Sequence, residues 1–238
     1  MVLKASASEA ASTVTEAVLL LENGDQLTRD EFERRYTAMP QIKKAELIEG
    51  IVYMPSPVRI AQHAEPHAHL LIWLGLYVMG TPGVRVADNA TVRLELDNEL
   101  QPDVLLYIDQ AYGGQSRIDA DGYMAGAPEL VAEVAASSAS YDLHAKMQVY
   151  RRSGVREYLV WRALDQAIDW FVLRTGHYIC LPVGADAIIR SEMFPGLWLA
   201  PAALLDGALA TVHTVAQQGL ASPEHAAFVA RVQANRRP

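Results

Sequence analysis

Cysteine is nearly absent from this chain of 238 residues, in which Cys180 is the one copy. A single cysteine excludes an internal disulfide framework and any zinc site built from several thiolates. We expect Cys180 to be a small hydrophobic residue buried in a strand. Long apolar runs are missing as well, since none reaches the roughly 18–20 residues that a membrane span needs. Glu9 and Glu16 interrupt the small-residue stretch near the N-terminus, which does not fit a secretory signal, so a cytoplasmic protein is predicted.

Positive charge is also in deficit. The 28 Asp and Glu residues outnumber the 20 Lys and Arg residues, which gives a net charge of -8. Proteins that coat nucleic acid unspecifically are usually basic, so this class is not favoured. A nuclease is not excluded, because carboxylates that hold a metal count as negative charge and the bound cation reverses their local effect. Apolar residues make up 51% of the chain, which is enough to bury a sizeable core.

The pattern of apolar and turn residues predicts an α/β fold around a mixed central sheet flanked by helices. Three helices are predicted, over residues 28–35, 63–79 and 141–152. Thr28 and Ser140 are their expected caps, and Gly154 is an expected stop. Strands are predicted over residues 45–54 (as a pair), 84–96, 104–108, 130–135 and 157–161, with an added hairpin over 168–173 and 177–181. Asn98-Glu99 is expected to form a turn, and residues 113–126 a long loop.

Two carboxylates stand in surroundings that should exclude them. Glu133 lies in the run ELVAEVAA, which otherwise reads as a strand buried on both faces, and Asp103 opens the strand VLLYI after Pro102. A buried carboxylate must be paired, neutralised or bound to a metal. Two that meet at one sheet end would repel each other unless a cation lay between them, and oxygen ligands suit Mg²⁺ or Mn²⁺. The alternatives are a strand-entry turn for Asp103, and for Glu133 an ion pair with Arg156 or Lys146.

Lys146 is the third unusual residue. It shares one face of the predicted helix with Leu143, Met147 and Tyr150, whose apolar character should turn that face toward the sheet. A lysine there could hold a phosphate oxygen or a nucleophilic water beside a metal. The alternative is a lysine that extends its amine to solvent.

These residues resemble the pattern of the PD-(D/E)XK nuclease superfamily. Within it, the chain is similar to the Uma-two (Uma2) family of restriction-endonuclease-like proteins, formerly a domain of unknown function. The matching pieces are AELIEGIVYMPSP at 45–57, His63 at the head of a helix, QPDVLLY at 101–107, GAPELVAEVAASSASYDL at 126–143, Lys146, YRRSGVREYLVW at 150–161 and FPGLWLAPAALL at 194–205. The resemblance covers roughly residues 27–206 and implies a restriction-endonuclease-like domain there. Outside it, we expect a partly disordered N-terminal extension over residues 1–26 and a C-terminal helical extension over 207–238.

The resemblance also implies site residues. Asp103 and Glu133 are expected to bind Mg²⁺ (or Mn²⁺), with a backbone carbonyl from Val134 as a further ligand. The superfamily places a lysine two residues after the glutamate, where this chain has Ala135. In this family the lysine comes from the following helix, and Lys146 fits that position.

Glu46 and His63 match further family positions near the metal. The alternatives are a surface residue of an edge strand for Glu46 and a capping or hydrogen-bonded structural histidine for His63. His63 and His67 could share a metal, but the metalloprotease glutamate is missing and His69 points to another face, so no zinc site is expected.

The sequence therefore predicts an endonuclease that uses Mg²⁺ to hydrolyse phosphodiester bonds of DNA. A homodimer is compatible with this, because nucleases of this fold often pair to cut two strands. The alternative is a binding or scaffold protein that kept the fold without catalysis, which Ala135 and the acidic charge favour slightly. Basic residues that could contact a phosphate backbone, or only cover a solvated surface, are Lys43, Lys44, Arg59, Arg151, Arg152 and Arg156.

Overall fold

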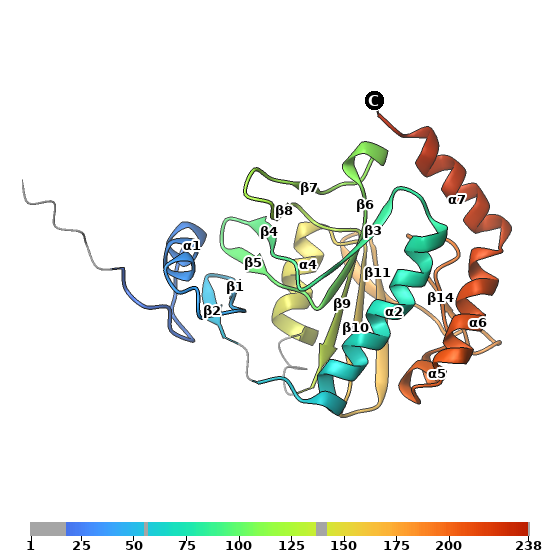
Figure 1. The fold of residues 1–238 in the computed structure, drawn as a ribbon, viewed down its shortest axis with the longest axis horizontal. Coiled ribbons are helices and arrows are strands. Elements are labelled where there is room, and N and C mark those ends of the chain that lie inside the picture. Colours follow the sequence, from blue (N-terminus) through green and yellow to red (C-terminus); the bar gives the residue numbers. More distant parts are fainter. Residues whose placement is uncertain (1–17, 55–56, 137–141, 238) are drawn as a thin grey trace, which may run out of the picture.

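The frame of the molecule is a six-stranded mixed sheet. The computed structural model describes residues 18–54, 57–136 and 142–237. The strand order of this central sheet is β12-β11-β10-β9-β6-β3. Its strands are β3 (Val84–Asp88), β6 (Val104–Ile108), β9 (Leu130–Ala135), β10 (Glu157–Arg162), β11 (Ala167–Arg174) and β12 (His177–Cys180). β9 and β10 run parallel, whereas the other neighbours are antiparallel. The predicted α/β fold with a mixed sheet is confirmed (Figure 1).

A second sheet of six short strands lies beside the first, in the order β2-β1-β5-β4-β8-β7. Its strands are β1 (Glu46–Ile48), β2 (Ile51–Tyr53), β4 (Val92–Glu95), β5 (Asn98–Leu100), β7 (Arg117–Ile118) and β8 (Met124–Ala125). The single strand predicted over residues 84–96 is wrong, because its two halves belong to different sheets. Asn98-Glu99 lies inside β5, and the turn falls at residues 96–97. Both side chains are buried, so polar character there marked a buried network rather than a turn.

The expected hairpin at the start of this sheet is confirmed. β1 and β2 pair antiparallel around Glu49 and Gly50, which have φ angles of 52° and 76°. Left-handed backbone at both central residues gives the tight turn whose twist matches that of the flanking strands. A further pair, β13 (Ile189–Arg190) with β14 (Trp198–Leu199), completes the strands of the described residues.

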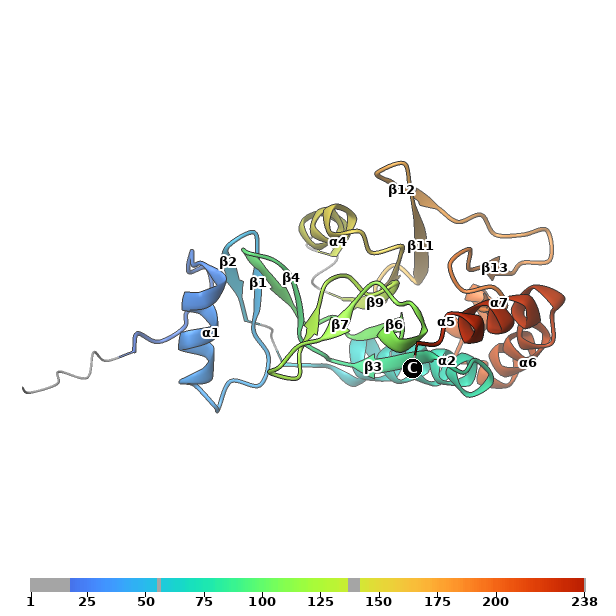
Figure 2. The same ribbon diagram turned by 90° about the horizontal axis from the view of Figure 1, so that it is seen from above.

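Helices cover both faces of the central sheet, as Figure 2 shows. On one face lie α2 (Glu65–Gly80), α5 (Pro201–Leu205), α6 (Leu209–Leu220) and α7 (Pro223–Ala234); on the other lies α4 (Met147–Ser153). π-helical turns precede α2 and α4: η1 (Ile60–Ala64) and η3 (Asp142–Lys146). A 3-10 turn, η2 (Gln110–Tyr112), follows β6, and α1 (Arg29–Thr37) packs at the β1–β2 hairpin. The three predicted helices are confirmed, and the domain boundaries stay predictions.

The ends of these helices follow the predicted signals where they are described. Thr28 caps α1, since its Oγ1 accepts a hydrogen bond from the Glu31 N–H at 3.4 Å. Gly154 ends α4 with a φ of 88°. The predicted cap Ser140 lies outside the described residues. No helix within residues 18–54, 57–136 and 142–237 is both long enough and apolar enough to cross a membrane.

Alternation along β9 decides where its charged residue points. Leu130, Ala132 and Val134 pack into the core beneath α2 and the C-terminal helices. Val131 and Ala135 pack into the core beneath α4. Since successive side chains of a strand face opposite sides, Glu133 belongs to the face that α4 covers.

Cys180 is exposed, so the prediction of a buried cysteine is wrong. It does lie in a strand, but β12 is the last strand of its sheet and has no neighbour beyond it. Burial within an edge strand depends on what covers the edge, which strand propensity does not encode.

Glu157, at the start of β10, is fully buried and connects residues 191–193 to the sheet. Its carboxylate accepts hydrogen bonds from the Trp170 indole, the Ser191 hydroxyl and the backbone N–H groups of Glu192 and Met193, at 2.8–3.1 Å. Burial raises the pKa of Glu157 from 4.5 to about 7, against the lowering effect of these donors.

A pH dependence of stability follows from that pKa. Between pH 4.5 and about 7 the folded protein binds more protons at Glu157 than the unfolded chain does, so stability falls as the pH rises through this window. At 1.36 kcal/mol per pKa unit, the loss is about 3 kcal/mol. Glu157→Gln should remove it, which urea denaturation across this range would measure. Glu192→Gln, in the same turn but exposed, is the matched control. If the free energies of unfolding of wild type and Glu157→Gln changed equally with pH, the prediction would be wrong.

Candidate metal centre

Asp103 and Glu133 meet at one end of the central sheet, and each is 2% exposed. β6 and β9 are antiparallel neighbours that pair Val104 with Ala132, which sets the two carboxylates side by side. The Val134 N–H donates to Asp103 Oδ2 at 2.9 Å, and the Asp103 N–H donates to Glu133 Oε2 at 3.3 Å. Each carboxylate is therefore held by the backbone of the neighbouring strand region.

Lys146 joins the two sheets at this point. Its Nζ lies 3.0 Å from Glu133 Oε1 and 3.0 Å from Glu46 Oε2. Glu46, the first residue of β1, also accepts a hydrogen bond from the Gln101 N–H at 2.8 Å. Lys146 and Glu46 are each 7% exposed, so neither the solvent-extended lysine nor the surface glutamate describes them.

Tyr150 belongs to the same cluster, although the sequence marked it only as part of an apolar helix face. Its hydroxyl donates to Glu133 Oε1 at 2.9 Å, and the residue is fully buried. Burial, followed by the charge of Glu133, raises the pKa of Tyr150 well above its ordinary value. The tyrosine thus stays protonated and acts as a permanent donor. Its position one helical turn after Lys146 was the available signal.

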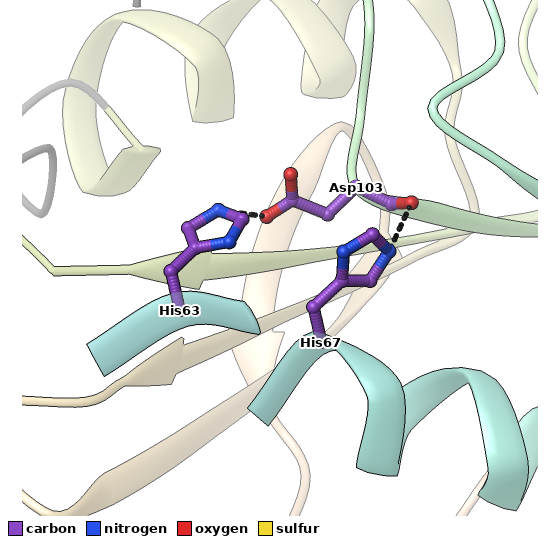
Figure 3. Close-up of side chains that lie close together, drawn as sticks. All are labelled: His63, His67 and Asp103. Atoms are coloured by element: carbon purple, nitrogen blue, oxygen red, sulfur yellow. Dashed lines mark hydrogen bonds and ion pairs between the residues drawn. The ribbon is translucent and has the colours of Figure 1, made fainter. Parts of the chain in front are cut away.

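Two histidines approach Asp103 from η1 and α2, as Figure 3 shows. His63 Nε2 lies 3.1 Å from Asp103 Oδ2. His67 Nε2 lies 3.0 Å from the Asp103 carbonyl oxygen and 2.8 Å from Asp88 Oδ1. Because both neighbours of that nitrogen are acceptors, we assign its proton to Nε2, which leaves Nδ1 with a free lone pair. A histidine held in this way by a carboxylate is a common arrangement among metal ligands.

Lys44, for which the sequence left open a phosphate contact or a solvated surface role, also belongs to the site. Its Nζ donates to Asp103 Oδ1 at 3.3 Å and to Asn89 Oδ1 at 3.2 Å. Burial alone would raise the pKa of Asp103, but the hydrogen bond from His63 and the charge of Lys44 outweigh it and lower the pKa. Burial would lower the pKa of Lys44, and the charge of Asp103 reverses this and raises it. Both groups are therefore charged at neutral pH.

The residues around Asp103 fit a divalent cation. One potential ligand atom from each of His63, His67 and Asp103 lies within 4.8 Å of the others. His63 Nδ1 is buried and has no hydrogen-bond partner among the described residues. A set of one carboxylate and two imidazoles suits Mn²⁺ and similar transition-metal ions, whereas Mg²⁺ would use the carboxylate oxygen and waters. The sequence placed His63 near the metal, and the structure places His67 at Asp103 as well.

Glu133 and Val134, the other predicted metal ligands, are engaged differently. Both carboxylate oxygens of Glu133 accept hydrogen bonds, one from the Asp103 N–H and the other from Tyr150 and Lys146. Val134 reaches Asp103 through its N–H. Their roles as ligands stay predictions. His69 is separate: its ring lies 6.3 Å from that of Trp161.

Comparison with known proteins identifies the family and the fold. A family model, Uma2, described as "Putative restriction endonuclease", matches residues 29–202. The solved structure of "a putative nuclease belonging to DUF820" from Anabaena variabilis is similar, with a TM-score of 0.56 at 16% identity over 75% of this chain and 99% of that one. At this identity the likeness shows the fold alone. A comparison with curated proteins found no match.

Proposed function

The chain belongs to the Uma2 family, and on that premise we propose that it is a metal-dependent endonuclease that hydrolyses DNA phosphodiester bonds. The observation that carries the proposal is the buried Asp103 carboxylate with His63 and His67 beside it. A carboxylate with two imidazoles within ligand distance of one another suits a divalent cation. Membership of the family supports the reaction class, and the three residues around Asp103 support the binding of an ion.

In this proposal Asp103, His63 and His67 hold Mg²⁺ or Mn²⁺, with Glu133 and the Val134 carbonyl as further ligands. The ion, when bound, would lower the pKa of a water and neutralise charge on the phosphate. Asp88 orients His67 through its hydrogen bond of 2.8 Å. For Glu133 to reach the ion, its side chain must exchange at least one of its present hydrogen bonds.

Lys146 is proposed to influence the reaction through its contact with Glu133. It balances the charges of Glu133 and Glu46, each 3.0 Å from its amine. Its amine would supply positive charge next to Glu133 that could stabilise negative charge on a bound water or phosphate oxygen. Tyr150 is a positioning residue, because its hydroxyl fixes the same Glu133 oxygen.

A second candidate is a scaffold protein without catalysis. The favouring observation is that Glu133 already has a full set of partners, so the fold is satisfied without an ion. Ala135, in place of the lysine of the superfamily pattern, points the same way. The two candidates differ in whether a cation changes the protein.

Cation removal decides between them. Wild-type protein should cut plasmid DNA in Mn²⁺ or Mg²⁺ and should lose that activity in EDTA, because the ion provides both the nucleophile and charge neutralisation. The melting temperature should rise with Mn²⁺, since an ion that binds only the folded state stabilises it. Sedimentation of the same preparation would show whether the protein forms the homodimer that is compatible with this function. Absence of cleavage and of any thermal shift would leave the scaffold as the function.

A further inference from the structure

The site holds two lysines, and their surroundings differ. Lys146 lies between two carboxylates, and its side chain is 8% exposed. Lys44 contacts one carboxylate, Asp103, and the amide oxygen of Asn89, and its side chain is 23% exposed. Lys44 is therefore the lysine that a large substrate can approach without breaking the ion-pair network that joins the two sheets.

Lys44 contacts Asp103 Oδ1, the carboxylate oxygen that neither Val134 nor His63 contacts. Oδ2 accepts from the Val134 N–H and contacts His63, whereas Oδ1 contacts Lys44. A divalent cation on Asp103 would bring further positive charge within a few ångströms of the Lys44 amine. At such separations two like charges repel strongly in a partly buried site. The ion and the Lys44–Asp103 pair therefore compete.

A phosphate group would resolve this competition. Phosphate on the ion adds negative charge next to the displaced amine, which is a compact cation with three rotatable donors. Asn89 gives the amine a neutral neighbour at 3.2 Å that does not depend on Asp103.

We propose that Lys44 occupies Asp103 in the absence of a cation and, when the cation binds, turns to contact the phosphate of the substrate. This inference rests on the proposed function, because it takes the substrate to be a nucleic-acid phosphate at the Asp103 ion. It assigns to Lys44 substrate contact and to Lys146 the charge balance of Glu133 and Glu46. Loss of the Lys44 amine should therefore strengthen cation binding and weaken substrate binding.

The test compares Lys44→Met with Lys43→Met. Lys43 is the matched control, because it is the adjacent residue, is exposed and donates only to the Pro40 carbonyl oxygen among its described contacts. Calorimetry should show that Lys44→Met binds Mn²⁺ about tenfold more tightly than wild type, since a competing charge is gone. Binding of a short DNA duplex in Ca²⁺, measured against salt, should weaken, and the salt slope should fall by about 1. Lys43→Met should leave the Mn²⁺ affinity unchanged.

Both changes are required. If Lys44→Met matches Lys43→Met in Mn²⁺ affinity or in the salt slope of DNA binding, the inference is wrong, whatever the wild type cuts. If wild type cleaves no DNA while Lys44→Met shows both changes, the endonuclease proposal fails and the assignment of Lys44 as a phosphate contact stands. Melting temperatures of the two variants would show that the fold is retained.

Discussion

Asp103→Asn is expected to abolish divalent-cation binding and to lower DNA cleavage by roughly 10³ or more, the scale of losing a central electrostatic group. Asn has nearly the same size, so the strand should keep its place. It lacks the negative charge that balances the ion, and it can accept at one oxygen instead of two. Mn²⁺ titration by calorimetry and a cleavage assay on the same preparation would measure both effects.

The same substitution should change stability in a pH-dependent way. His63 and Lys44 overcome burial and hold the pKa of Asp103 below its ordinary 3.8. A carboxyl whose folded pKa is depressed stabilises the fold above its unfolded pKa, and that contribution is lost as the pH falls through the folded value. Wild type should therefore be more stable than Asp103→Asn at neutral pH, and the difference should shrink in acid.

Asp109 offers the matched control, because it follows β6 as directly as Asp103 precedes it. Its carboxylate contacts Arg85 at 2.6 Å and the Ala111 N–H at 2.9 Å, away from both histidines. Asp109→Asn removes the same charge from the other end of the strand and should leave Mn²⁺ affinity and cleavage as they are. Undiminished Mn²⁺ affinity in Asp103→Asn would exclude the proposed centre.

Lys146→Met should have the largest effect on folding. The substitution removes the cation shared by two buried carboxylates, each 3.0 Å from the amine. Breaking a buried ion pair from one side costs about 3–5 kcal/mol, because the remaining charge stays in a poorly solvated place. Cleavage should also fall by roughly 10²–10³, since Met supplies no charge beside the attacking water. Denaturant unfolding and a cleavage assay at saturating Mn²⁺ would measure the two losses separately.

Two further variants make the result specific. Glu46→Gln added to Lys146→Met removes one of the two like charges, so it should recover part of the lost stability without restoring cleavage. Arg151→Met, on the exposed side of α4, removes a cation that contacts the Gln148 side chain and the Gly176 carbonyl oxygen. If Arg151→Met and Lys146→Met unfold at the same denaturant concentration, the lysine between the sheets contributes no more to stability than a surface arginine, and the prediction is wrong.

The secondary structure of the central sheet was available from local pattern. A continuous apolar run marked β9 as a strand buried on both faces, and the periodic apolar residues around Lys146 marked a helix. In the second sheet the β1–β2 hairpin was predicted, whereas β5, β7 and β8 were missed, because they are only two or three residues long and β5 carries buried polar residues. The pairings that assemble this sheet, β1 with β5 and β4 with β8, join segments far apart in the chain, so no local window contains their signal.

The candidate site divides in the same way. The sequence alone singled out Asp103, Glu133 and Lys146, because each places a charge where an apolar pattern demands burial. That reasoning needs nothing beyond the local period and the cost of burying a charge. It identified the residues and offered Lys146 as an ion-pair partner of Glu133, which the structure shows at 3.0 Å, but it predicted none of their other contacts.

The contacts were decided by the tertiary structure. Lys44 meets Asp103 across 59 positions of the chain, and Lys146 meets Glu46 because the second sheet docks beside the first. His67 joins the group because α2 begins next to the start of β6. A lysine on a short loop and a histidine on a helix look the same in sequence whether they face water or a carboxylate. Only the packing of elements that are distant in the chain determines which charge each one meets, and hence which can hold an ion or a phosphate.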